Sequence, residues 1–207
     1  KIKVHDVYFS YAENINEADC LVPDLNIKWI TTRMPVVTDL WKRKDYLSRK
    51  DNSWTTILTW NDFHNKLIFN GKEYKSKGAE FEKIKSIPGT TNQKFKIAVG
   101  GKNVPLKELM DLGWQVQDGP ETTLTPGTYQ NFILNSKGEF SIAKNVYVAM
   151  NTGWFSCRSV CYMAAGKPVV LQDTGFSKFI QTGKGVLAFS NLKEATEAIK
   201  MVEDDYN

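Results

Sequence analysis

Residues 153–159, GWFSCRS, bring together side chains that could bind an anion. Ser156 is suited to cap a helix that begins at about Phe155, and Arg158 falls in the first turn of that helix. The first N–H groups of a helix have no partner within it and carry the positive end of its dipole. These groups, the Ser156 or Ser159 hydroxyl and the Arg158 guanidinium would together hold a phosphate.

A purely structural interpretation explains the same residues. In that case Ser156 only caps the helix and Arg158 reaches into solvent. Spacing alone leaves both interpretations open.

The helix near residue 155 needs a sheet to position it, and the sequence predicts one. From residue 53 onward, short β-rich runs alternate with helical segments, which is typical of a parallel sheet covered on both faces. The expected strands are 54–60, 95–101, 114–118, 139–144, 168–172 and 185–190. The expected helices are 78–87, 105–113, 127–137, 155–165 and a last one capped by Asn191.

The fold class is therefore α/β, a Rossmann-like parallel sheet of about six strands with helices on both faces. Open sheets of this kind bind ligands beyond the C-terminal ends of their strands. The 153–159 loop follows the expected strand 139–144 and opens a helix, so it lies at that edge.

The chain is expected to have two parts, an extension or interdomain segment at 1–52 and a Rossmann-like domain at 53–207. The first part lacks clean periodicity and should pack on the domain through apolar side chains, namely Trp29, Val36, Val37, Leu40 and Trp41. The sequence begins at Lys1 rather than Met, and we expect it to be a fragment of a longer protein.

Composition and charge narrow the class of partner. The 207 residues are 42% hydrophobic and 24% charged, as in an ordinary globular domain, and the net charge of +4 is mixed along the chain. That balance favours a local anion site over a nucleic-acid surface, and the Lys-rich runs 42–50 and 72–78 are interpreted as solvated. With no apolar run of about 20 residues and no signal-peptide pattern, we expect no membrane span and a cytoplasmic location.

Three cysteines, Cys20, Cys157 and Cys161, include a pair at helical i,i+4 spacing. Two thiols without a nearby histidine do not make a zinc site, and such a pair is usually too far apart to bridge. We expect the three cysteines to be small buried residues, and we expect no bound metal.

Residues 153–199 resemble the donor-binding half of GT-B fold glycosyltransferases. The resemblance rests on a Gly-aromatic loop, a helix ending in small-A-x-G-x-P-V-V, a D-x-G and a T-G-x-G. The matching residues are Met163, Ala164, Ala165, Gly166, Pro168, Val169, Val170, Asp173, Gly175, Thr182, Gly183 and Gly185. The segments 136–144 and 153–159 are similar to S-x-G-E-F-S-x-A-K and G-W-F-S-x-R-S of bacterial glycosyltransferase-like proteins.

The resemblance implies a domain that binds a nucleotide-sugar, with its diphosphate at a helix N-terminus and against a basic residue from an earlier loop. KSKG at 75–78 is similar to the Lys-Gly after the first strand, which makes Lys77 a candidate contact; an exposed lysine at a helix start is the alternative. The candidate donor-binding residues are Lys77, Glu139, Gly153, Trp154, Phe155, Ser156, Cys157, Arg158 and Ser159. The implied partners are a nucleotide-sugar, an unknown acceptor and a second Rossmann-like domain upstream, with no metal cofactor.

This sequence also departs from that family. The two carboxylates of its Glu-x7-Glu motif align with Gly153 and Cys161, and Trp60 and Asn61 occupy the place of an arginine after the first strand. Glu139 is the nearest other carboxylate, although a Glu at a strand start is often structural. No catalytic residue is therefore assigned.

Two functions remain open at this stage. One is a glycosyltransferase, or the donor-binding part of one, which could be inactive as a single domain. The other is a non-catalytic binding or assembly module. An NAD-dependent oxidoreductase is disfavoured because VGGKNVP, at 99–105, does not form G-x-G-x-x-G.

Overall fold

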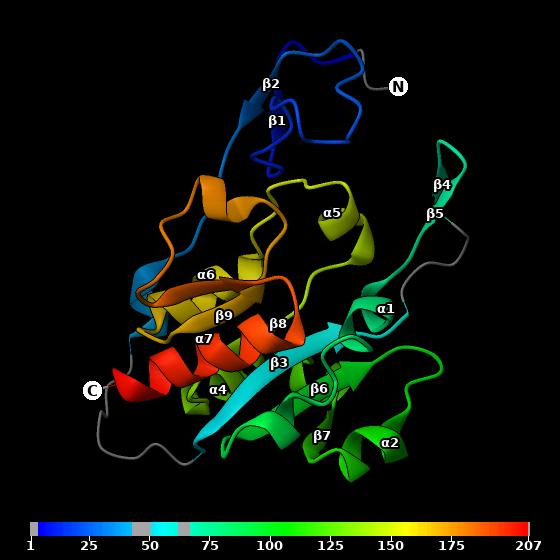
Figure 1. The fold of residues 1–207 in the computed structure, drawn as a ribbon. Coiled ribbons are helices and arrows are strands. Elements are labelled where there is room, and N and C mark those ends of the chain that lie inside the picture. Colours follow the sequence, from blue (N-terminus) through cyan, green and yellow to red (C-terminus); the bar gives the residue numbers. More distant parts are fainter. Residues whose placement is uncertain (1–3, 43–50, 62–66, 207) are drawn as a thin grey trace.

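The computed structural model describes residues 4–42, 51–61 and 67–206. A six-stranded parallel sheet forms its centre (Figure 1). Its strands are β3 (Ser53–Thr59), β6 (Lys94–Gly100), β7 (Trp114–Asp118), β8 (Gly138–Ser141), β9 (Val169–Gln172) and β10 (Val186–Phe189). The strand order is β10-β9-β8-β3-β6-β7, so the chain builds outward from β3, first to one side and then to the other. This is the order of a Rossmann-like sheet and confirms the predicted fold class.

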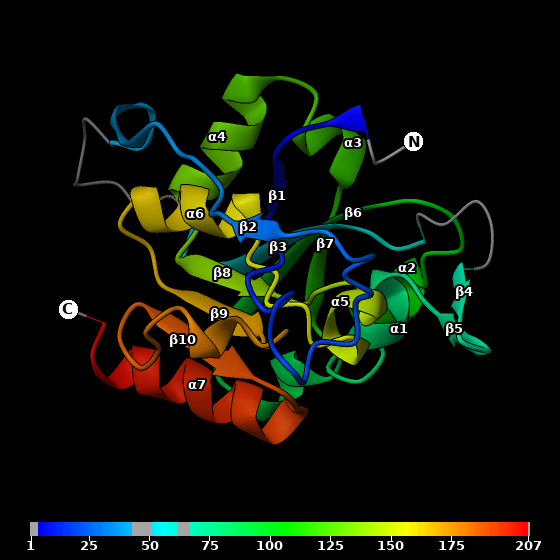
Figure 2. The same cartoon turned by 90° about the horizontal axis from the view of Figure 1, so that it is seen from above.

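Helices cover both faces of the sheet. They are α1 (Lys77–Phe81), α2 (Leu106–Asp111), α3 (Gly119–Thr122), α4 (Pro126–Asn135), α5 (Asn145–Ala149), α6 (Cys157–Ala164) and α7 (Leu192–Asp204). Short 3-10 turns occupy Thr38–Trp41, Ile87–Thr90 and Phe176–Lys178. Figure 2 shows α4 and α6 on one side of the sheet and α7 on the other.

Each face of the sheet has its own apolar core. On the α7 side, buried aromatic rings pack together, and Phe140 stacks on Phe189 with ring centroids 5.3 Å apart. On the α4 and α6 side, Ile133 and Tyr162 pack against Val169 of β9. Burial of these side chains supplies the main driving force for this fold.

The predicted strands are confirmed within a few residues, while several helical boundaries differ. The helix expected at 78–87 ends at Phe81, and turns lead to a 3-10 segment at Pro88, a residue that disfavours helical backbone before it. The strand expected to reach Lys144 ends at Ser141. The loop that follows contains α5, and α6 begins at Cys157 because Ser156 is its N-cap.

A small hairpin was not predicted. The strands β4 (Leu67–Phe69) and β5 (Lys72–Tyr74) pair antiparallel around Asn70 and Gly71. Both turn residues have positive φ, 49° and 72°, as an Asn-Gly hairpin turn requires.

The N-terminal extension contains its own two strands, β1 (Tyr8–Ser10) and β2 (Trp29–Thr31), which pair parallel to each other and apart from the main sheet (Figure 1). Farther along, Trp41 is buried and Val36 packs beside it against the α4 and α6 face, as predicted. The prediction is wrong for Val37 and Leu40, each 63% exposed. Trp29 packs edge-on against Tyr8 within the extension, at 5.8 Å between centroids.

No helix among the described residues combines the length and apolar character needed to cross a bilayer.

Candidate anion-binding site

A cavity of about 370 Å³ opens at the C-terminal edge of the sheet. Its walls are the end of β3, residues 57–59, together with Gly100–Gly101 at the end of β6 and Gly119–Pro120 at the start of α3. Lys77, Lys144 and Arg158 line it. We call this cavity the basic crevice. It lies where the chain order reverses around β3, which is the usual ligand position in open α/β sheets.

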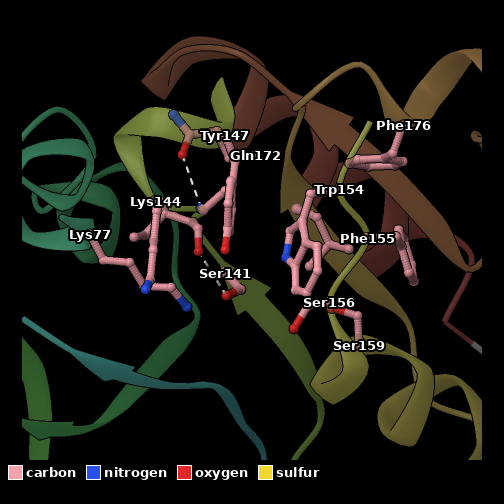
Figure 3. Close-up of a pocket in the computed structure, with 13 residues that line it drawn as sticks. Lys77, Ser141, Lys144, Tyr147, Trp154, Phe155, Ser156, Ser159, Gln172 and Phe176 are labelled. Carbon is pink, nitrogen blue, oxygen red and sulfur yellow. Dashed lines mark hydrogen bonds between the residues drawn. The ribbon is translucent and has the colours of Figure 1, made fainter. Parts of the chain in front are cut away.

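A smaller pocket of about 40 Å³ adjoins the basic crevice and shares Lys77 and Lys144 with it (Figure 3). We call it the aromatic pocket, because Trp154 and Tyr147 form one part of its wall with ring centroids 5.1 Å apart. Its other lining side chains include Ser141, Ser156, Ser159, Gln172, Phe155 and Phe176. Across the described part of the chain, no carboxylate lines either cavity.

The start of α6 supplies hydroxyl groups to the aromatic pocket. Ser156 is the N-cap, and its hydroxyl accepts from the Arg158 backbone N–H at 3.2 Å, as the structural interpretation predicts. It nevertheless lines the pocket. The Ser159 hydroxyl is fully buried, has no hydrogen-bond partner among the described residues and belongs to the same lining. A buried polar group without a partner carries a free-energy penalty, so a ligand that bonds Ser159 would gain from relieving it.

Arg158 does not reach into solvent. Its Nε donates to Glu139 Oε1 at 2.6 Å, and its two terminal nitrogens donate to the Ile57 carbonyl and to the Ser141 hydroxyl. Burial alone would lower the pKa of the guanidinium, but the charge and hydrogen bond of Glu139, together with Tyr162 and Tyr129, raise that pKa above its ordinary value. The guanidinium is therefore a fixed cation in the wall of the basic crevice.

Glu139 lies beneath the site rather than in it. The residue is fully buried, and its second carboxylate oxygen has no partner among the described residues. Glu139 and Ser141 are two positions apart on β8, so their side chains share one face of the sheet. Both point to the α6 side and both contact Arg158. The carboxylate orients the guanidinium and does not line either cavity.

Gly153 contacts the N-terminal extension instead of a cavity. Its φ is +72°, and a Cβ added there would lie 2.5 Å from the backbone nitrogen of Asn14. The Asn14 N–H donates to the Thr152 carbonyl at 3.1 Å, and Ala12 forms a bridge with Trp154. The glycine therefore allows two backbones to approach closely.

The Cys157 thiol is exposed and lines neither cavity. Cys20 and Cys161 are half-buried, so the expectation of three buried cysteines is wrong. Burial raises the pKa of both the Cys20 and the Cys161 thiol. Nowhere in residues 4–42, 51–61 and 67–206 do three His, Cys, Asp or Glu side chains gather as they would around a metal ion.

The structure brings six candidate residues to these two cavities: Lys77, Trp154, Phe155, Ser156, Arg158 and Ser159. It places Glu139, Gly153 and Cys157 outside both linings. Sequence reasoning missed Lys144, Tyr147 and Gln172. Lys144 carried a usable signal, because it ends the run that predicted a strand and therefore had to fall at the ligand edge.

No protein-family model matches this chain, and comparison with curated proteins finds no match.

Proposed function

We propose that this chain is the nucleotide-sugar-binding domain of a GT-B-type glycosyltransferase, which transfers a sugar from a nucleotide-diphosphate donor to an acceptor. One observation carries the proposal: the basic crevice combines two lysines and one arginine at the reversal point of a Rossmann-like sheet. A diphosphate has the charge and size to suit a crevice lined by two lysines and an arginine. The likeness of residues 153–199 to such enzymes supports the same conclusion.

Each lining group has a role in this proposal. Lys77 and Lys144 neutralise the diphosphate as point charges, while Arg158, held by Glu139, Ile57 and Ser141, adds a fixed positive charge to the wall of the crevice. These cations would also stabilise the charge that develops on the diphosphate as the sugar leaves. In the aromatic pocket, Ser159 offers a hydroxyl to a polar group of the ligand that extends from the crevice.

The N-terminal extension supports the proposal of a second Rossmann-like domain. Parallel sheets usually have both faces covered, yet β1 and β2 form a parallel pair with Phe9 62% exposed and Ile30 44% exposed. Such a pair is stable mainly as part of a larger sheet. A second domain seated there would supply the acceptor site and the catalytic groups.

A non-catalytic binding module is the second candidate. The observation that favours it is the lack of a carboxylate in either lining among the described residues. Both candidates bind the donor, and only the first turns it over when the second domain is present.

Titration calorimetry with UDP, GDP, ADP and TDP and with their sugars tests the proposal. One nucleotide should bind, and Lys77→Ala should weaken its binding by about 1 to 3 kcal/mol, as expected for a lost charge-assisted hydrogen bond. Lys200→Ala is the matched control, since Lys200 is an exposed lysine of α7 outside both linings. Absence of binding by every nucleotide at millimolar concentration would contradict the proposal.

A further inference from the structure

A buried carboxylate, Glu80, lies next to the aromatic pocket and accepts a hydrogen bond from Gln172 in its lining. The residue is fully buried on α1, and each of its oxygens accepts from the Lys83 ammonium at 2.8 Å. Oε1 also accepts from Asn145 Nδ2 at 2.7 Å, and Oε2 accepts from Gln172 Nε2 at 2.6 Å. A single side chain thus joins α1, α5 and the end of β9.

The two amide partners extend this network to the backbone. Asn145 Oδ1 accepts from the Lys75 N–H at 3.0 Å, and Gln172 Oε1 accepts from the Ala143 N–H at 3.2 Å. Both amides therefore use an oxygen and a nitrogen at once, which fixes their orientation. We call Glu80, Asn145 and Gln172, with these backbone contacts, the Glu80 clamp.

Lys77 and Lys144, the two lysines of the basic crevice, are each flanked in the sequence by residues that the clamp bonds. Lys77 lies between Lys75 and Glu80, which are both bonded in the clamp. Lys144 lies between Ala143 and Asn145, which are also both bonded in it. The backbone segments that carry the two cations are thereby fixed to each other, although they are far apart in the sequence.

We propose that Glu80 is a positioning residue for anion binding, which sets the separation of Lys77 and Lys144 in the basic crevice through the Glu80 clamp. The proposal rests on the proposed function, because it names what holds the cations of the diphosphate site. Glu80 itself touches no ligand, since it lines neither cavity.

The charge of Glu80 is what makes the clamp work. A carboxylate accepts all of these hydrogen bonds, whereas a glutamine would present an N–H group to donors and leave a buried bond unmade. Burial alone raises the pKa of Glu80, but hydrogen bonds from Asn145, Lys83 and Gln172, with the Lys83 charge, lower it overall. The carboxylate therefore stays ionised at neutral pH.

The test compares the pyrophosphate affinity of three variants with that of the unmodified chain by calorimetry, well below their unfolding temperatures. Glu80→Gln should weaken binding about tenfold, as expected for disruption of a coupled polar network. The exchange Glu80→Gln with Asn145→Asp returns a carboxylate to the clamp at a residue that lines neither cavity, and it should restore most of the affinity. Glu203→Gln removes a carboxylate bonded to Trp54 and Lys137 away from the crevice and should leave affinity unchanged.

A second measurement needs no ligand. In Glu80→Gln, amide hydrogen exchange should accelerate in residues 75–81 and 143–149 together, with strand β6 unaffected. Unchanged pyrophosphate affinity in Glu80→Gln, or unchanged exchange in the two segments, would overturn the positioning role. If the unmodified chain binds no pyrophosphate at millimolar concentration, the proposed function fails instead, and the exchange data still decide whether Glu80 holds the two segments.

Discussion

Charged side chains at the ligand edge of this sheet are held by two buried carboxylates, Glu139 and Glu80, that line neither cavity. Arg158 is fixed by Glu139 and by backbone, and the lysines of the basic crevice are fixed indirectly by Glu80. Removing one partner of a buried ion pair is costly, because it leaves the other charge without compensation. At the residue scale, the site is therefore a set of cations whose geometry exists before a ligand arrives.

The lowered pKa of Glu80 predicts an acid-dependent stability. A carboxylate whose folded-state pKa is below its ordinary value of 4.5 contributes stability above pH 4.5. That contribution is lost as the pH falls through the folded-state pKa. Thermal unfolding of the unmodified chain and of Glu80→Gln, followed between pH 7 and pH 3, should show a difference in Tm that shrinks as the pH falls. A difference in Tm that is the same at every pH would contradict this prediction.

At the scale of elements, hydrogen bonds to two loops of the sheet domain hold the N-terminal extension in place. Asn14 donates its side-chain amide to the Asn151 carbonyl at 2.7 Å, and Asp19 accepts from the Asn151 side chain at 2.6 Å. Arg33 bonds both Glu13 and the Phe179 carbonyl, at 3.0 Å and 2.7 Å. The loops around residues 151 and 179 thus hold the segment that carries β1 and β2 beside the aromatic pocket.

Gly153→Ala should loosen this docking. Its Cβ would lie 2.5 Å from the Asn14 nitrogen, in addition to the strain of positive φ. Gly166→Ala is the matched control, because Gly166 has a φ of +69° but open space around it. We expect the control to cost about 1 kcal/mol in unfolding free energy and Gly153→Ala to cost clearly more.

Hydrogen exchange in residues 12–21 distinguishes the two variants further. It should rise only in Gly153→Ala, because only that substitution displaces the backbone of Asn14. Equal stability losses with equal exchange would show that the close approach at Gly153 is unimportant.

The sheet and its order could be predicted from the sequence because buried parallel strands are short, β-rich and regularly spaced. The β4–β5 hairpin was also within reach, since Asn70-Gly71 is a strong turn signal. The Glu80 clamp was not, because Glu80 and Gln172 are 92 positions apart and nothing local pairs them. Likewise, only the tertiary structure shows that Gly153 faces Asn14 rather than a ligand.

At the scale of the whole molecule, the two edges of the sheet offer different cavities. The C-terminal edge carries the basic crevice, lined by three cations. A cavity of about 720 Å³ lies at the N-terminal edge, between the ends of α6 and α7, and mixes Lys167 and Lys184 with Asp204 and Asp205. Volume alone would favour the second cavity, whereas charge and strand topology favour the first. For an anionic donor we expect charge and topology to decide.

The central claim is that a nucleoside diphosphate binds at the C-terminal edge, and backbone amide NMR during a nucleotide titration tests it most directly. The proposal predicts that one of UDP, GDP, ADP or TDP shifts the amide signals of Gly100, Lys144 and Ser156 in a saturable manner. Shifts confined to Gly166, Gly185 and Tyr206 at the opposite edge, or no shift at millimolar nucleotide, would contradict it.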